Sequence, residues 1–231
     1  MKKILIPSLA LTAPLHASVL SHYTFAGNSF ASSDTHLTST SSDYTLYSSG
    51  TQDINGERVR ISSDSTNSSG QTTTPLSNRA HHSFTLTAAP GQEITLDNLT
   101  LAYSFQNTFD DPVLAPGLQA YFDAFVSTDG FATHTYLGGA MVDGNNYTNG
   151  STTADFNLDF TLPAGTTGTN PGAYAEGTTL EFRLYFTDNS TAGTRYHRVD
   201  SIIVNGETIP EPSGTALFGL ALSFSLLKRR R

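Results

Sequence analysis

Apolar and polar side chains alternate along the middle of this chain, and this period of two constrains the fold more than any other feature. The clearest runs are 156–162 and 180–186, in which Phe and Leu occupy every second position. Such alternation is typical of a strand with one face in the core. We find no convincing amphipathic helix in 18–208. We therefore expect an all-β fold of about nine or ten strands, a single antiparallel β-sandwich of the jelly-roll type.

The alternation changes phase once, between Leu96 and Leu99, which predicts a bulge or a tight turn at Asp97-Asn98. The last strand is expected over about 194–204. Ser, Thr, Asn and Asp dominate residues 28–78. We expect short edge strands and long surface loops there.

The N-terminal residues 1–17 differ from this body. Lys2 and Lys3 precede a short apolar stretch, and small residues follow at Ala17 and Ser18. This order is typical of a secretory signal peptide, with cleavage by signal peptidase between Ala17 and Ser18. The sequence therefore predicts export.

The C-terminal residues 209–231 have three parts. An uncharged apolar segment, 213–227, is shorter than the ~20 residues of a comfortable membrane span. It follows a motif formed by Pro210, Glu211 and Pro212. It precedes the basic residues Lys228, Arg229, Arg230 and Arg231. We expect a transmembrane helix whose basic stop-transfer tail stays on the cytoplasmic side of the inner membrane. A plain membrane anchor that is never cut is the alternative.

This three-part end resembles the PEP-CTERM sorting signal of bacteria that make exopolysaccharide. In that family an exosortase, which is a membrane transpeptidase, recognises the Pro-Glu-Pro motif and processes the protein near it. The resemblance implies an exosortase as partner. It also implies localisation first at the inner membrane, and then at the cell surface or in the extracellular matrix.

Two internal segments extend the resemblance to the body. Residues 127–131, Ser-Thr-Asp-Gly-Phe, look like the S-x-D-G-F hairpin of PEP-CTERM proteins with a galactose-binding-like sandwich. Residues 198–202, Arg-Val-Asp-Ser-Ile, look like their closing strand, which pairs with 180–186. This likeness implies a fold more than an activity.

Charge and composition exclude several classes of protein. The chain has a formal net charge of −8 at pH 7 and no cysteine, so disulfides and thiolate metal sites are excluded. The body lacks lysine and is acidic, which argues against nucleic-acid binding. Asp123 and Glu181 could be offered as a hydrolytic carboxylate pair, but any acidic sandwich would supply one. We expect no enzyme.

Few residues stand out as candidate ligands. Asp110, Asp111, Asp188 and Asp200 are candidate calcium ligands, with solvated turn acids as the alternative. No other cofactor is expected. Arg183 and Asp200 would form a cross-strand ion pair if the last two strands make a hairpin. Alternatively, Arg183, Tyr185 and Asp200 would bind a ligand.

The function that these features predict is that of an exported surface or matrix protein without catalytic activity, associated with exopolysaccharide. The alternative is a lectin-like carbohydrate-binding module. In such a module, exposed tyrosines would stack on sugar rings. The candidates are Tyr121, Tyr136, Tyr147, Tyr174 and Tyr196.

Overall fold

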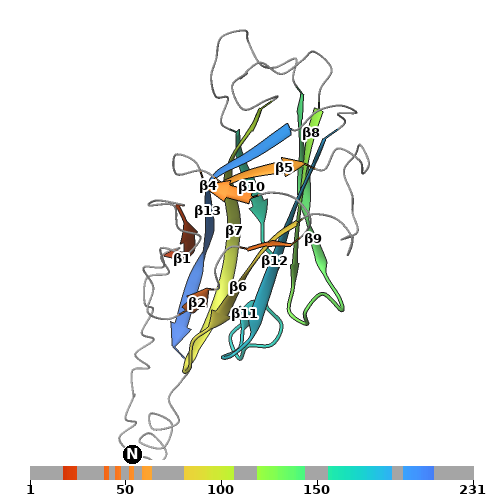
Figure 1. The fold of residues 1–231 in the computed structure, drawn as a ribbon. Coiled ribbons are helices and arrows are strands. Elements are labelled where there is room, and N and C mark those ends of the chain that lie inside the picture. The colour runs from red at the N-terminus through yellow and green to blue at the C-terminus, as the bar shows by residue number, and fades with distance from the viewer. Residues whose placement is uncertain are drawn as a thin grey trace, which may run out of the picture.

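The computed structural model describes residues 18–24, 39–41, 45–47, 52–54, 59–63, 81–106, 119–143, 156–188 and 195–210 (Figure 1). The strands are β1 (Ser18–Tyr23), β2 (Ser39–Ser41), β3 (Thr45–Tyr47), β4 (Gln52–Ile54), β5 (Val59–Ser63), β6 (His81–Ala88), β7 (Gln92–Gln106), β8 (Gln119–Ser127), β9 (Thr135–Asp143), β10 (Phe156–Thr161), β11 (Ala173–Tyr174), β12 (Thr179–Asp188) and β13 (Arg195–Pro210). None of these ranges contains a helix long and apolar enough to cross a membrane.

The strands form two antiparallel sheets, which confirms the all-β prediction. Sheet A has seven strands in the order β10-β7-β13-β5-β4, with β1 paired to β13 and β11 to β7. Sheet B has six strands in the order β2-β6-β12-β8-β9, with β3 paired to β6. The strands outnumber the expected nine or ten because region 28–78 contributes four short ones, as its composition predicted, and because β11 adds a very short one.

Aromatic rings join the apolar faces of the two sheets. The ring of Tyr23 in sheet A lies 5.0 Å from that of Phe84 in sheet B, and Tyr103 lies 5.8 Å from Phe186. Phe122 of sheet B contacts Phe160 of sheet A at 5.4 Å. Aromatic pairs at these separations contribute beyond the area they bury. The alternating apolar residues therefore face one shared core, as a β-sandwich requires.

Two bulges keep the long strands β7 and β13 in phase with this core. Asn205 pairs with Asn98 and Gly206 with Leu96, so Asp97 is the extra residue, which confirms the predicted bulge. In β13, Val199 and Ser201 pair with successive residues of β7, so Asp200 is extra. Each bulge restores the inward direction of the apolar side chains that follow it.

The last two strands do not form a hairpin, and that prediction was wrong. β12 has β6 and β8 as its neighbours in sheet B, so both of its edges are occupied. β13 pairs instead with β7, β5 and β1 in sheet A. The chain therefore crosses between sheets after Asp188, and Arg183 and Asp200 are not cross-strand neighbours.

The predicted targeting segments fall mostly outside the described residues. Ser18 is the first residue of β1 and pairs with Gly206. β13 runs past the expected end of the body at 208, because Ile209 and Pro210 still pair with Glu93 and Gln92 of β7. Residues 1–17 and 211–231 lie outside the description.

The aromatic contacts between the sheets predict a large effect of truncating Phe122. This side chain is 1% exposed and contacts three other rings. We expect Phe122→Ala to lower the free energy of unfolding by about 3–5 kcal/mol, because it leaves a cavity between the sheets. Phe122→Leu, the control, should cost clearly less. Urea denaturation measures both, and equal losses would contradict this account of the core.

Candidate ligand-binding cleft

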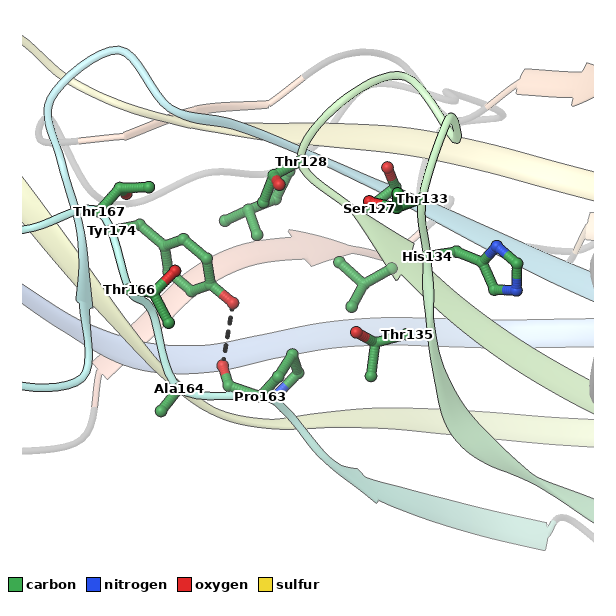
Figure 2. A pocket seen from close by; sticks show the side chains of 12 residues that line it. Ser127, Thr128, Thr133, His134, Thr135, Pro163, Ala164, Thr166, Thr167 and Tyr174 are labelled. Atoms are coloured by element: carbon green, nitrogen blue, oxygen red, sulfur yellow. Dashed lines mark hydrogen bonds between the residues drawn. The ribbon is translucent and has the colours of Figure 1, made fainter.

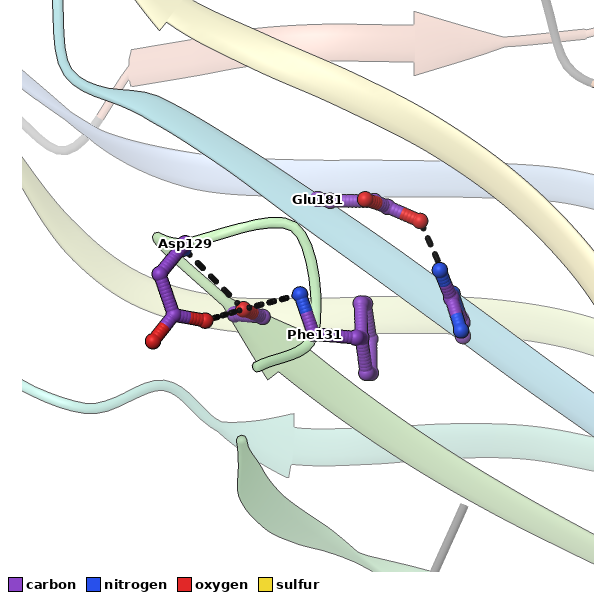
Figure 3. A network of polar contacts seen from close by, with 5 residues as sticks. Asp129, Phe131 and Glu181 are labelled. Atoms are coloured by element: carbon purple, nitrogen blue, oxygen red, sulfur yellow. Dashed lines mark hydrogen bonds and ion pairs between the residues drawn. The ribbon is translucent and has the colours of Figure 1, made fainter. Parts of the chain in front are cut away.

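A tight turn joins β8 to β9, and the Asp129 carboxylate holds its shape. The carboxylate accepts hydrogen bonds from the Thr133 backbone N–H, from the Thr133 hydroxyl at 2.6 Å and from the Ser127 hydroxyl at 2.8 Å. The Ser127 hydroxyl oxygen in turn accepts the backbone N–H of Asp129 and Phe131 (Figure 3). This cluster confirms the hairpin predicted from the Ser-Thr-Asp-Gly-Phe pattern.

The turn forces Phe131 into an unusual backbone conformation. Gly130 and Phe131 have φ of 68° and 67°, the signs that a type I′ turn requires at both central positions. Glycine adopts this region freely, whereas another residue pays about 1–2 kcal/mol. The hydrogen bonds around Asp129 offset this cost. The turn therefore fixes the direction in which the Phe131 side chain leaves the backbone.

A second loop, residues 163–172, lies opposite this turn and is fastened by Glu93 of β7. The Glu93 carboxylate accepts hydrogen bonds from the backbone N–H and the side chain of both Thr169 and Asn170, at 2.5–2.9 Å. Glu93 is 0% exposed because this loop covers it. Its carboxylate lies between sheet A and the loop, outside the core between the two sheets. One buried acid thus fixes the loop to sheet A.

The bonds from Thr169 and Asn170 change the acidity of Glu93. They lower its pKa to about 2, the hydroxyl and N–H of Thr169 being the main causes, while burial opposes them. The hydrogen bonds from Thr133 likewise lower the pKa of Asp129 to about 2. Both anchors are therefore fully charged at neutral pH.

Between the turn and the loop lies a cleft of about 220 Å³ (Figure 2). Its lining residues come from the end of β8, the β8–β9 turn, the start of β9, the 163–167 loop, β11 and β12. They are Val126, Ser127, Thr128, Thr133, His134, Thr135, Pro163, Ala164, Thr166, Thr167, Tyr174 and Leu180. Val126, Leu180 and the Tyr174 ring are buried and give the cleft an apolar side. Six hydroxyl-bearing Ser and Thr side chains surround it.

The hydroxyls of the cleft divide into two groups. Ser127, Thr133 and Thr167 hold the walls together through hydrogen bonds of their own. The second group makes no side-chain hydrogen bond within the described part of the chain, and all its members are exposed. It consists of Thr128, Thr135 and Thr166. Figure 2 shows that it comes from both walls, Thr166 from the loop and the other two from the β8–β9 side.

Among the described residues, no Asp, Glu, Lys or Arg side chain lines the cleft. Burial raises the pKa of Tyr174, whose hydroxyl donates a 3.1 Å hydrogen bond to the carbonyl oxygen of Pro163. Tyr174 therefore stays neutral. A ligand would meet hydroxyls, one imidazole and apolar surface.

Beside the cleft, the outer face of sheet B carries an ordered ion pair. Arg183 Nε donates to Glu181 Oε1 at 2.8 Å, and the Arg183 guanidinium carbon lies 3.8 Å from the centre of the Phe131 ring (Figure 3). Tyr185, two residues further along β12, is 1% exposed. Burial raises its pKa, and the nearby Arg183 opposes that shift. Sequence reasoning selected Arg183 and Tyr185, and the structure places both on this face.

The other predicted site residues do not gather. Asp200 lies in sheet A, away from the face of sheet B that carries Arg183. Asp110 and Asp111 lie outside the described residues, and Asp188 ends β12 in sheet B. Across the ranges that the structure describes, no three His, Asp or Glu side chains are grouped to hold a metal ion. Calcium binding stays a prediction.

Neither of the two offered carboxylates lines the cleft, and among the offered tyrosines whose side chains are described one does. Asp123 and Glu181 belong to the outer face of sheet B, where Asp123 is buried and accepts a hydrogen bond from Tyr136. Tyr121 donates a hydrogen bond to Gln119 at 2.6 Å, and Tyr174 is the one described candidate that lines the cleft. Tyr147 and the side chain of Tyr196 lie outside the description. Sequence reasoning missed the three exposed threonines. The chain contains many threonines, and no sequence pattern distinguishes these three from the others.

Comparisons with known proteins add little. No protein-family model and no curated protein matches the chain. Among solved structures, the chain is similar to TmCBM61 in complex with beta-1,4-galactotriose, with 13% identity and a TM-score of 0.31. The match covers 79% of this chain and 93% of that one. At this level of likeness, the comparison tells nothing about the ligand of this chain.

The hydrogen bonds to Glu93 predict a specific loss of stability in acid. Because its folded pKa of about 2 lies below the ordinary value of 4.5, the stabilisation is complete above pH 4.5 and disappears as the pH falls toward 2. We expect Glu93→Gln to lower the melting temperature at pH 7 and to flatten its dependence on pH below 4.5. Thermal unfolding followed across this range measures both, and a variant that melts like the native chain at pH 7 would contradict the role of Glu93.

Proposed function

We propose that this chain is a carbohydrate-binding protein whose cleft takes one uncharged sugar ring. The observation that carries the proposal is an uncharged cleft with one apolar side and three unengaged threonine hydroxyls. A pyranose ring presents an apolar C–H face and an edge of hydroxyls. Threonine hydroxyls both donate and accept, so they can bond to such an edge without adding charge.

The size and rigidity of the cleft also favour this ligand. Its volume of about 220 Å³ lies below the ~300–1,000 Å³ typical of pockets for larger molecules, which suits a single ring. Both walls are fastened by carboxylates, Asp129 on one side and Glu93 on the other. Walls that are already ordered reduce the entropy lost on binding.

Binding without turnover fits this site best. Glycoside hydrolysis uses two carboxyl groups that flank the scissile bond. The lining of the cleft contains none, and Asp123 and Glu181 lie on the outer face of sheet B. We therefore infer a binding module, without catalysis and without calcium at the cleft, built on a sandwich of jelly-roll type.

We further propose that the protein is exported and sorted to the cell surface or matrix. The support is the order of parts in the sequence: a signal-peptide pattern before Ser18, then the Pro-Glu-Pro motif, the apolar segment and the basic tail. An exosortase would process the chain near Pro210, and the sandwich would then meet exopolysaccharide. The sugar of that polymer is the ligand we expect.

Removing the unengaged hydroxyls should weaken sugar binding. Each of Thr128→Val, Thr135→Val and Thr166→Val deletes about 1 kcal/mol of hydrogen bonding, or roughly fivefold in Kd, while keeping the side chain's shape. The measurement is binding to a printed array of neutral and acidic glycans, followed by titration with the sugars bound. Chelation of calcium should change nothing.

Thr161→Val is the matched control, because Thr161 is exposed and does not line the cleft. It should bind like the native protein. If the native protein binds no glycan, or if all four variants bind equally well, the proposed site is wrong.

Processing at the C-terminus should be visible in the intact mass. We expect protein from cells with an active exosortase to lack about the last 20 residues, roughly one membrane span, and protein from cells without the enzyme to retain them. Mass spectrometry of the recovered protein and cell fractionation measure this. An uncut tail in both strains would leave a plain membrane anchor.

A further inference from the structure

The ion pair on the outer face of sheet B has hydrogen-bonding groups that no described part of the chain uses. Arg183 contacts Glu181 through Nε alone, and its guanidinium also lies within hydrogen-bonding reach of the Tyr185 hydroxyl. The remaining N–H groups of its two terminal nitrogens have no partner among the described residues. Glu181 Oε2 is likewise without a hydrogen bond there. The two side chains are 21% and 23% exposed. Unused donors and an unused acceptor therefore lie next to each other at the surface.

These groups are held in place before any ligand arrives. The Phe131 ring packs on one face of the guanidinium, with 3.8 Å from the guanidinium carbon to the ring centre. The turn, which holds Phe131 at φ 67°, sets the direction of its Cα–Cβ bond and so contributes to this contact. Backbone strain of this kind is found preferentially at functional sites. A fixed arginine also loses less conformational entropy when it binds.

The ion pair adjoins the cleft. Glu181 is the cross-strand partner of Ser127, which lines the cleft. His134 lines the cleft as well, and its ring lies nearly parallel to that of Phe131, 14° apart with centroids at 6.4 Å. A chain of contacts thus leads from the cleft through His134 and Phe131 to Arg183.

We propose that Arg183 and Glu181 form a second subsite, which binds the vicinal hydroxyls of the next sugar in the same polymer. One hydroxyl accepts a hydrogen bond from an Arg183 terminal nitrogen, and its neighbour donates to Glu181 Oε2. The proposal rests on the proposed function of the cleft, which holds one ring. The next ring would then lie over the turn.

The charges favour an uncharged sugar at this subsite. Glu181 neutralises Arg183, and the chain as a whole carries a net charge of −8. A uronate would be repelled by that surplus and would find no unpaired cation here among the described side chains. Affinity for the neutral sugar should therefore change little with salt concentration.

The experiment compares chain lengths on one array. The probes are mono-, di- and trisaccharides of glucose, galactose, mannose and xylose, with the corresponding uronates alongside. The native protein should bind a neutral disaccharide about tenfold more tightly than its monosaccharide. Arg183→Lys keeps the charge but loses the planar guanidinium fork. The affinity of this variant for the disaccharide should therefore fall to its affinity for the monosaccharide. Its affinity for the monosaccharide should not change.

A second variant and a stability measurement keep the test decisive. Glu181→Gln can still accept the Arg183 Nε–H but replaces a carboxylate acceptor, and it should lower only disaccharide affinity, about threefold. Thermal unfolding identifies any variant that fails to fold. Three outcomes would overturn the second subsite alone. They are equal affinity of the native protein for mono- and disaccharides, equal losses of affinity for both sugars in the variants, and a preference for uronates. Absence of all glycan binding would overturn the cleft as well.

Discussion

The pairing of β7 with β13 is the interaction on which the rest of the structure depends. These strands run antiparallel from Gln92–Pro210 at one end to Gln106–Tyr196 at the other, and every other strand of sheet A except β4 pairs with one of them. So long a ladder would drift out of phase with the core if it were regular. The extra residues at Asp97 and Asp200 correct the phase, and both halves of each strand keep apolar side chains inward.

The same ladder places the candidate site. β7 presents Glu93 on the side away from the core, since Ile94 beside it is buried in the core. Glu93 then fastens the loop that leaves β10, and β11 within that segment pairs with β7 again. The β8–β9 turn of sheet B stands opposite. The cleft therefore lies where an anchored loop of one sheet meets a tight turn of the other.

Features of the fold that depend on neighbouring residues could be predicted from the sequence, whereas features that depend on distant residues could not. The alternation in 180–186 predicted a strand with one buried face, and the phase change at Asp97 predicted a bulge, because both follow from the two-residue period. Sheet membership did not follow, since the period says which face is buried but not which strand lies alongside. Hence β12 and β13 were paired wrongly. The cleft depends on Glu93 meeting Thr169, 76 residues away in sequence, and no short-range pattern records such a contact.

The acidic composition suggested that carboxylates could bind a metal ion or act in hydrolysis. In the described part of the chain, the two carboxylates that matter most to the cleft instead hold its walls in place and do not line it. An acidic body without lysine has few cations with which to pair its acids, and a buried carboxylate without partners is costly. Glu93 and Asp129 find their partners instead in backbone N–H groups and threonine hydroxyls, which also lower the pKa of both to about 2. Threonine thus serves twice at this end of the sandwich. Some threonine hydroxyls order the walls of the cleft by donating hydrogen bonds to carboxylates. Others remain available to a ligand because the carboxylates already accept hydrogen bonds from different groups. The described carboxylates are thereby kept out of the lining of the cleft itself, as the proposed binding of an uncharged sugar requires.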